Sequence, residues 1–364
     1  MAIDYATKYA SKIDERFALA SQTANAVNND YDFVGTKTVK VYSIPTVGLV
    51  DYNRSGLNRY GTPSELQNSV QELTLGMDRS FTFSVDRGNY EDTQRANSAG
   101  LSLNRELTEQ VIPEVDRYRL LKMAIGAGKI KTGAITSYYG EVLAANAELT
   151  EGKAPLTGRM LFVSPTAYSN IKLDSAFVSA RDVRDNLSGN GVVGMIDGAS
   201  VVVLPSTYMP FGAEMLMTHR VATVGAQKLA EYKVHDNPPG INGWLVEGRV
   251  YYDAFVLDNK KAAIYVVQST AGAITITAEA GSSGKCLVTI TSDILAAKAG
   301  AKIMYKAGAS LTAPTLGADV STWTEVTGSS FEFAGTAGHK VCVVYAIDGK
   351  AYAVSNLGTV ALGA

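Results

Sequence analysis

The stretch of residues 36–56 most constrains the fold of this chain, because it is typical of a strand and has no obvious partner. Val39, Val41 and Ile44 recur at nearly every second position before the chain turns into Asp, Asn and Gly, and this period indicates an extended strand. The preceding segment is helical in pattern and the following segment is polar. Backbone N–H and C=O groups need hydrogen-bond partners, so the partner of this strand must come from elsewhere.

Residues 69–87 alternate apolar and polar side chains in a way that predicts a β-hairpin. Leu73 and Leu75 lie on the first limb, residues 76–80 form the expected turn, and Phe81, Phe83 and Val85 lie on the second limb. The segments on either side are polar. We therefore expect this hairpin to project from the body with one apolar face.

A helical period replaces the alternation from Tyr90 to Ile125. Apolar residues recur there at steps of three or four, which predicts a long helix with one buried stripe. Pro113 removes one helical hydrogen bond, so we expect a kink or a division near Ile112. Gly126 then favours a stop.

The middle of the chain mixes short strands with helices. Residues 160–163 predict a strand, and Ser164 and Pro165 suit the N-cap and first position of a following helix. Asp197-Gly198 predicts the turn of a second hairpin. A short amphipathic helix is expected over residues 3–27. Together these patterns indicate an α+β body.

The composition changes at about residue 268. From 269 to 364 the sequence is rich in small residues and Thr and contains about seven short alternating segments, which predicts a β-sandwich of immunoglobulin or fibronectin type III style. Trp323 and Lys340 do not match the characteristic immunoglobulin positions. A domain boundary is therefore expected near 268.

Nothing in the sequence indicates a catalytic, cofactor or metal site. The three histidines, His219, His235 and His339, have no His or Cys at a zinc-binding spacing. The glycine stretches at 126–133 and 281–286 lack the Ser or Thr of a phosphate-binding loop. We expect no enzyme activity and no cofactor.

Charge and hydropathy exclude some partners. With a net charge of −2 and no cluster of Lys and Arg, the chain is not expected to bind nucleic acid tightly or sequence-specifically. The N-terminus lacks the apolar core of a signal peptide, and no apolar run reaches the length of a membrane span. Neither secretion by that route nor a membrane location is expected.

Several segments together resemble the major capsid proteins of tailed bacteriophages with the HK97-type fold. They are "KTVKVYSIPTVGLVDYNRSG", "ELTLGMDRSFTFSVDRGNYEDT", "NRELTEQVIPEVDRYRLLKMA", "MLFVSPTAYSNIK" and "GMIDGASVVVLPSTYMP". The order of these segments along the chain resembles that of the family, as do the segments themselves, and the resemblance covers roughly residues 30–268.

The resemblance implies a division of the chain into named parts. It assigns an N-terminal arm (1–62), an extended loop (63–90), a spine helix (91–125), a peripheral domain (126–190 and 256–268) and an axial domain (191–255), all within a capsid domain (1–268) that precedes the sandwich (269–364). In that family the arm and the extended loop lie across neighbouring subunits, which would give the unpaired strand its partner in another copy of the chain.

The resemblance also implies a function and its contact residues. The chain would form the hexamers and pentamers of an icosahedral shell around double-stranded DNA, assembled in the bacterial cytoplasm with portal and scaffolding proteins. The candidate subunit contacts are Leu73, Leu75, Met77, Arg79, Phe81, Phe83 and Val85 in the hairpin and Val39, Val41 and Ile44 in the arm. Some members cross-link subunits through a loop lysine, but residues 64–88 contain none.

Two points remain open at this stage. An appended immunoglobulin-like domain on the outer surface is compatible with binding of host-surface carbohydrate. The main alternative is a cell-surface or phage-tail adhesion protein, in which the sandwich does the binding and the front body is an anchor. A signal sequence would favour the surface version.

Overall fold

The computed structural model describes residues 21–31, 38–43, 47–55, 57–62, 65, 69–92, 99–180, 192–210, 213–268, 274–291, 302–315, 317–347 and 349–363. Most of the helix expected over 3–27 lies outside these residues, as do Ile44 and the segment 269–273 that follows the expected domain boundary.

The described residues form helices and strands in mixed order. The helices are η1 (Ala24–Ala26), α2 (Arg87–Asp92), α3 (Ala99–Glu106), the π-helix η2 (Leu107–Val111), α4 (Ile112–Ile125), α5 (Tyr138–Glu151), α6 (Pro165–Leu173), α7 (Ser175–Ala180) and η3 (Lys261–Ala263). The strands of the first part are β1 (Thr38–Ser43), β2 (Ser69–Thr74), β3 (Met77–Asp86), β4 (Lys129–Thr132), β5 (Arg159–Val163), β6 (Val192–Ile196), β7 (Ala199–Val203), β8 (Ala213–His219), β9 (Thr223–Asp236), β10 (Gly243–Val256) and β11 (Ile264–Gln268). Those of the last part are β12 (Ile276–Ala280), β13 (Lys285–Ile290), β14 (Lys302–Gly308), β15 (Thr324–Val326), β16 (Ser330–Ala334), β17 (Lys340–Ile347), β18 (Lys350–Val354) and β19 (Gly358–Thr359).

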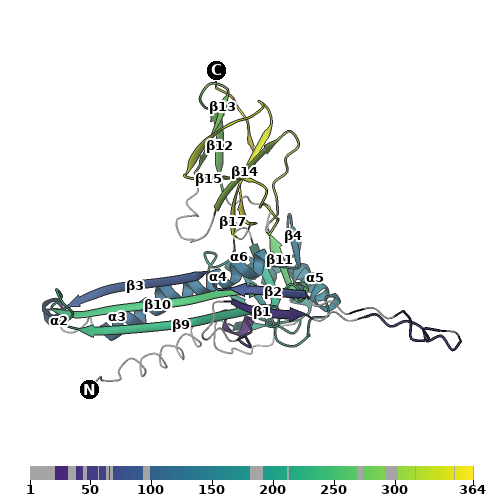
Figure 1. The fold of residues 1–364 in the computed structure, drawn as a ribbon, viewed down its shortest axis with the longest axis horizontal. Coiled ribbons are helices and arrows are strands. Elements are labelled where there is room, and N and C mark those ends of the chain that lie inside the picture. Colours follow the sequence, from purple (N-terminus) through teal and green to yellow (C-terminus); the bar gives the residue numbers. More distant parts are fainter. Residues whose placement is uncertain are drawn as a thin grey trace.

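One helical rod, α3–η2–α4, runs along the molecule (Figure 1). The π-helical turn η2 ends directly before Ile112 and Pro113. Proline has no N–H to donate and its ring crowds the carbonyl four residues earlier, so the helix widens at this point. Gly126 ends the rod by donating its N–H to the Lys122 carbonyl at 3.0 Å. The division near Ile112 and the stop at Gly126 are confirmed.

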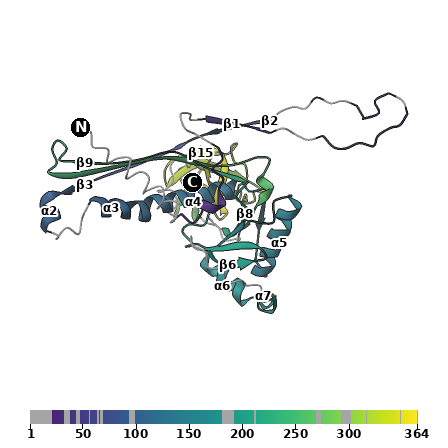
Figure 2. The same cartoon turned by 90° about the horizontal axis from the view of Figure 1, so that it is seen from below.

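A three-stranded antiparallel sheet, in the order β3-β10-β9, lies alongside this rod (Figures 1 and 2). The stripe of apolar residues on the rod, which includes Leu107, Val115 and Tyr118, packs against Val246 and Val250 of β10. The rod and the sheet thus form one elongated unit.

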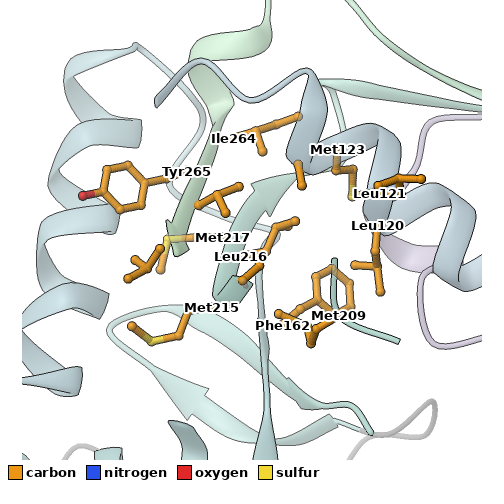
Figure 3. Close-up of a cluster of buried hydrophobic side chains, with 14 of the residues drawn as sticks. Leu120, Leu121, Met123, Phe162, Met209, Met215, Leu216, Met217, Ile264 and Tyr265 are labelled. Atoms are coloured by element: carbon orange, nitrogen blue, oxygen red, sulfur yellow. The ribbon is translucent and has the colours of Figure 1, made fainter. Parts of the chain in front are cut away.

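A six-stranded mixed sheet, in the order β4-β11-β8-β5-β7-β6, forms the second unit together with α5, α6 and α7 (Figure 2). Its core joins the end of the rod, where Leu120 and Met123 lie in one buried cluster with Phe162 of β5 and Leu216 of β8 (Figure 3). The mixture of parallel and antiparallel pairs agrees with the expected α+β body.

Two local predictions in this unit are confirmed. Ser164 caps α6, its Oγ accepting from the Ala167 N–H at 3.1 Å, and Pro165 begins that helix. Asp197 and Gly198, with φ of 47° and 79°, form the turn between the antiparallel strands β6 and β7. Both follow from side-chain chemistry that acts within a few residues.

The hairpin expected over 69–87 is wrong. β2 pairs with β1, from Thr38 opposite Thr74 to Ser43 opposite Ser69, whereas β3 pairs with β10. The strand over residues 38–43 therefore has its partner within the same chain, not in another copy. Alternation tells which side chains share a face, but it does not tell which strand lies alongside.

The expected division of the body after the spine helix also differs from the structure. Residues 191–255 do not form one unit, because β6, β7 and β8 belong to the six-stranded sheet and β9 and β10 belong to the three-stranded sheet. The long strands β9 and β10 return the chain to the helical rod. After them, η3 and β11 lead it back to the six-stranded sheet.

The last part of the chain forms two further antiparallel sheets, in the orders β12-β13-β16 and β15-β14-β17-β18. They pack face to face, and the ring centroid of Tyr305 on β14 lies 4.8 Å from that of Phe331 and 5.0 Å from that of Phe333 on β16. Both cysteines, Cys286 and Cys342, are buried as free thiols. The strands expected from the alternating pattern are present.

Gly317 lies where this last part meets the end of the rod. Its φ is 76°, and a Cβ at this position would lie 2.8 Å from the Ile125 carbonyl oxygen and 3.1 Å from Ile130 Cδ1. We expect Gly317→Ala to lower the free energy of unfolding by about 2 kcal/mol through strain and crowding. Urea unfolding measures this loss.

Two matched glycines separate the causes. Gly338, with φ of 83°, has open space around its missing Cβ, so Gly338→Ala reports backbone strain alone. Gly308 has open space and no left-handed φ, and Gly308→Ala should change stability by no more than about 0.5 kcal/mol. Equal losses at 317 and 338 would show that the contact with the rod contributes nothing.

Candidate assembly interface

The chain between β1 and β2 carries the most exposed apolar surface among the described residues. Leu49 is fully exposed, and Leu57 and Tyr60 are 95% and 86% exposed. Val47, Val50 and Tyr52 are each at least half exposed. Isolated exposed apolar residues are ordinary, but a group of them on one segment marks a contact surface.

We call residues 47–62 the projecting loop, because its described part extends away from both sheets (Figures 1 and 2). The loop makes contacts within itself. The rings of Tyr52 and Tyr60 meet edge to face at 5.0 Å between centroids, and Asn53 N donates to the Arg59 carbonyl at 3.0 Å. These contacts give the loop a shape while leaving its leucines open to solvent.

The base of the projecting loop is fixed to the body. Gln71 of β2 bridges two backbone groups: its Nε2 donates to the Val256 carbonyl at 2.9 Å and its Oε1 accepts from Asp258 N at 3.1 Å. Leu73 and Leu75 are buried in a cluster with Val224, Ala226 and Leu257. Leu73 of β2 and Leu75, which follows that strand, therefore anchor the base of the loop to the body.

Asp253 of β10 joins this base to the rod. Its carboxylate accepts from Gly76 N at 2.8 Å, from the Tyr118 hydroxyl at 2.9 Å and from Ala254 N at 2.7 Å. Burial raises the pKa of Asp253, and Lys122 and the hydrogen bonds oppose that rise. One carboxylate thus connects the link between β2 and β3 with α4.

The structure places the contact residues expected from the sequence at several depths. Leu73, Leu75, Met77 and Val85 are buried within the monomer, whereas Arg79, Phe81 and Phe83 of β3 are half-buried beside the rod. Val39 and Val41 of β1 are half-buried against the cluster around Leu73. The structure brings these residues to two separate places, the base of the projecting loop and the rod, rather than to one exposed face.

Sequence reasoning missed the projecting loop itself, because its Gly, Asn and Ser residues led us to treat the segment after Asn53 as a polar flank. The available signal was the recurrence of large apolar residues, such as Leu49, Leu57 and Tyr60, within a turn-rich stretch that has no strand period. Such residues cannot fold into a core alone and therefore need another surface.

A cavity of about 260 Å³ lies between η2 and the strands β3 and β10. Its wall combines apolar and charged side chains: Phe81, Val111, Pro113, Val115, Val250, Tyr252, Arg79, Arg117, Glu106, Glu109 and Glu114. Arg79 and Glu114 form an ion pair at 3.6 Å. Burial raises the pKa of Tyr252, which keeps its hydroxyl protonated. The cavity wall thus combines a protonated tyrosine hydroxyl with one Arg–Glu ion pair.

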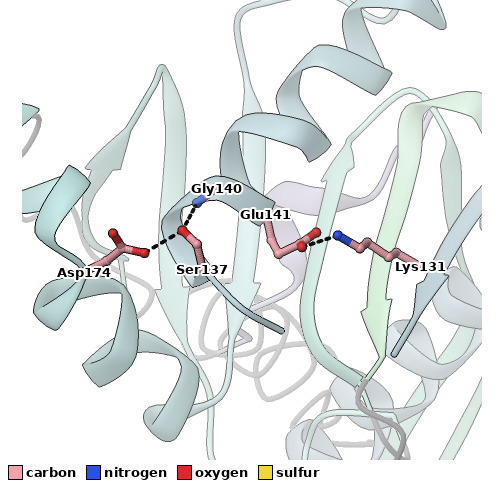
Figure 4. Close-up of polar contacts among 5 residues, drawn as sticks. All are labelled: Lys131, Ser137, Gly140, Glu141 and Asp174. Carbon is pink, nitrogen blue, oxygen red and sulfur yellow. Dashed lines mark hydrogen bonds and ion pairs between the residues drawn. The ribbon is translucent and has the colours of Figure 1, made fainter. Parts of the chain in front are cut away.

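Figure 4 shows polar contacts at the edge of the six-stranded sheet, and each of them has a structural role. Ser137 Oγ caps α5 by accepting from Gly140 N at 2.9 Å and donates to Asp174 at 2.6 Å. That hydrogen bond lowers the pKa of Asp174. Lys131 forms an ion pair with the buried Glu141. These groups satisfy helix ends and a buried charge, and they do not form a nucleophile–base pair.

The described residues contain no group of three or more His, Cys, Asp and Glu side chains that could hold a metal ion. No helix among them is both long and apolar enough to cross a membrane.

Comparison with known proteins identifies the fold. No family model and no curated protein matches the sequence, but solved structures match the fold. The capsid structure of the cyanophage P-SCSP1u has a TM-score of 0.53 and 10% identity, over 68% of this chain and 87% of that one. The chain has the fold of phage capsid proteins. The fold expected from the resemblance is confirmed at this level.

Other solved structures give the same answer. The head structure of Helicobacter pylori bacteriophage KHP40 has a TM-score of 0.52 at 10% identity, over 69% of this chain and 90% of that chain. A chain from Mycobacterium phage Che8 has a TM-score of 0.51 at 18% identity, over 67% and 89%. At these identities the likeness concerns the fold alone, and it spans most of each phage chain.

Proposed function

We propose that this chain is a major capsid protein that assembles into the hexamers and pentamers of an icosahedral phage head around double-stranded DNA. The observation that carries the proposal is the projecting loop on a chain with a capsid fold. A fixed base and an exposed apolar tip are what a subunit needs in order to reach a neighbouring copy. In a closed shell, many weak copies of one contact add up.

The proposed contacts are noncovalent and extend beyond the projecting loop. Residues 44–68 contain no lysine, so the loop offers no amine for a cross-link to a neighbour. The half-buried residues Arg79, Phe81 and Phe83, together with Val39 and Val41, are proposed as secondary contacts beside the rod and the loop base. The role is structural and needs no catalytic group or cofactor.

We further propose that the last part of the chain is an immunoglobulin-like domain displayed outside the shell. What supports this is its strand order: β12-β13-β16 and β15-β14-β17-β18 correspond to the A-B-E and C′-C-F-G sheets of such sandwiches. Host-surface carbohydrate is the proposed ligand class. Portal and scaffolding proteins are the expected partners during assembly in the host cytoplasm, and the shell of the virion is the final location.

The test is electron microscopy of the purified full-length chain in negative stain, together with sedimentation velocity. Rings, tubes or closed shells would support the proposal. A chain that remains a monomer on its own is then mixed with candidate scaffolding proteins. A monomer that persists in every mixture would contradict the capsid assignment.

A further inference from the structure

The cavity of about 260 Å³ between η2, β3 and β10 follows the rod over several turns. Its wall includes residues of the rod from 106 to 117, a stretch of about 15 Å at the rise of an α-helix. An extended peptide advances by about 3.3 Å per residue, so the cavity matches the length of four or five such residues. We call it the rod groove. The π-helical turn η2 forms part of its wall, and turns of this kind are frequent at functional sites.

Tyr252 places a buried hydroxyl without a partner in the wall of the rod groove. The residue is 3% exposed, and its hydroxyl has no hydrogen-bond partner. Glu114 and Arg79, which also line the groove, are the charged groups that act on it most strongly, but neither makes a well-formed hydrogen bond with it. A buried polar group without a partner is costly and rare. An acceptor atom of a ligand in the groove would satisfy it.

Arg117 repeats this pattern further along the rod groove. Its guanidinium carbon lies 5.1 Å from the centroid of the Tyr208 ring, and its Nε is buried without a hydrogen-bond partner. The groove therefore offers two unused donors, the Tyr252 hydroxyl and the Arg117 Nε–H. A purely apolar ligand would leave both unsatisfied, whereas a peptide backbone presents a carbonyl oxygen at every residue.

The strand β3 borders the rod groove with its open edge. β3 is an edge strand, and β10 is its only partner strand among the described residues. Arg79, Ser80 and Phe81 of β3 all line the groove. Successive side chains of a strand point to opposite faces, so three consecutive residues in one wall indicate that the edge itself faces the groove. Such an edge offers unpaired N–H and C=O groups to an added strand.

The charges around the rod groove favour a ligand with a basic residue at one end. Arg105 neutralises Glu109 at 2.7 Å, and Arg79 lies 3.6 Å from Glu114. Glu106 lines the groove at the α3 end and forms no ion pair within the part of the chain that the structure describes. A lysine or arginine of the ligand would pair with it, and the apolar part of the wall would hold a neighbouring apolar side chain.

We propose that the rod groove binds an extended peptide of a partner protein, which lies along the β3 edge with one apolar side chain in the cavity and one basic side chain beside Glu106. The Tyr252 hydroxyl and the Arg117 Nε–H would donate to its backbone carbonyls. Arg79 and Phe81 also belong to the proposed secondary contacts between copies, so the test must separate a foreign peptide from a second copy. The site does not depend on shell formation.

The test selects ligands for the full-length chain from a library of acetylated and amidated random heptapeptides. We expect the selected peptides to share an apolar residue close to a Lys or Arg. Tyr252→Phe should weaken their binding at least fivefold, measured by fluorescence anisotropy, and should not lower the midpoint of thermal unfolding, because the hydroxyl has no partner to lose. Glu106→Gln should also weaken binding at least fivefold at low salt, and less at high salt.

A pair of tryptophan variants provides the control. Gln110 is exposed and lines the rod groove, so Gln110→Trp should cover the groove and weaken binding at least twentyfold. Thr108 is exposed on the same turn but does not line the groove, so Thr108→Trp should leave binding unchanged. Peptides held by the projecting loop bind both variants equally and are discarded.

Two outcomes would overturn the proposal. In the first, no peptide is enriched on the wild-type chain over the Gln110→Trp chain, or the enriched peptides bind Tyr252→Phe as well as wild type. In the second, Gln110→Trp changes the sedimentation of the chain alone and no peptide is selected, which would assign the groove to a contact between copies.

Discussion

A chain in which Leu49, Leu57 and Tyr60 are all replaced by serine will fold normally and will not form shells. These side chains touch no core in the monomer, so the midpoint of thermal unfolding should stay within about 2 °C of the wild-type value. In the assembly, burial of each such side chain stabilises a contact by about 1.5–3 kcal/mol. Loss of three at every contact should abolish assembly, as seen by electron microscopy and sedimentation.

The matched control for the loop variant removes exposed leucines elsewhere. Leu156 and Leu173 belong to the six-stranded unit and are 66% and 79% exposed. Leu156→Ser with Leu173→Ser should leave shell formation intact, because these positions lie outside the projecting loop. If the loop variant assembled normally, or if the control failed equally, the loop would not be the main subunit contact.

The local parts of the fold could be predicted from the sequence because their causes act over a few residues. Ser164 and Pro165 start a helix by capping it, Asp197 and Gly198 close a turn, and Pro113 disturbs a helix within one turn of its own position. Each of these features depends on the chemistry of one or two side chains. The structure has each of them where the sequence indicates.

The pairing of strands could not be predicted in the same way. Leu73, Leu75 and Phe81 alternate as in one hairpin, yet the chain does not fold back on itself at Gly76. The Gly76 N–H donates instead to the Asp253 carboxylate. That hydrogen bond comes from a residue 177 positions away. Only the folded arrangement shows that β2 belongs with β1 and β3 with β10.

The candidate interface was hidden for a related reason. Asp253 is one of 35 acidic residues, and only its burial beside the loop base sets it apart. The loop leucines differ from core leucines only in what surrounds them. Sequence patterns report the period of a segment, but they do not report which surface a turn-rich segment leaves open.

Replacement of Asp253 by alanine will lower the free energy of unfolding by about 3 kcal/mol. The side chain is 4% exposed, and its loss leaves Gly76 N, the Tyr118 hydroxyl and Ala254 N without their acceptor. Each buried donor that loses its partner costs about 1–3 kcal/mol, partly offset by relief from burying the charge. Urea unfolding measures the loss, and Asp258→Ala, an exposed carboxylate nearby, serves as the control.

The pH dependence of this effect has a definite sign. Because burial raises the pKa of Asp253, the folded chain binds that proton more tightly than the unfolded chain does. The stability gained from protonation is fully present below the ordinary aspartate pKa of about 3.9 and is lost as the pH rises through the higher folded value. The stability of the wild type relative to Asp253→Asn should therefore fall as the pH rises through this window. A difference that stayed constant or rose with pH would show that the three hydrogen bonds to the carboxylate outweigh its burial.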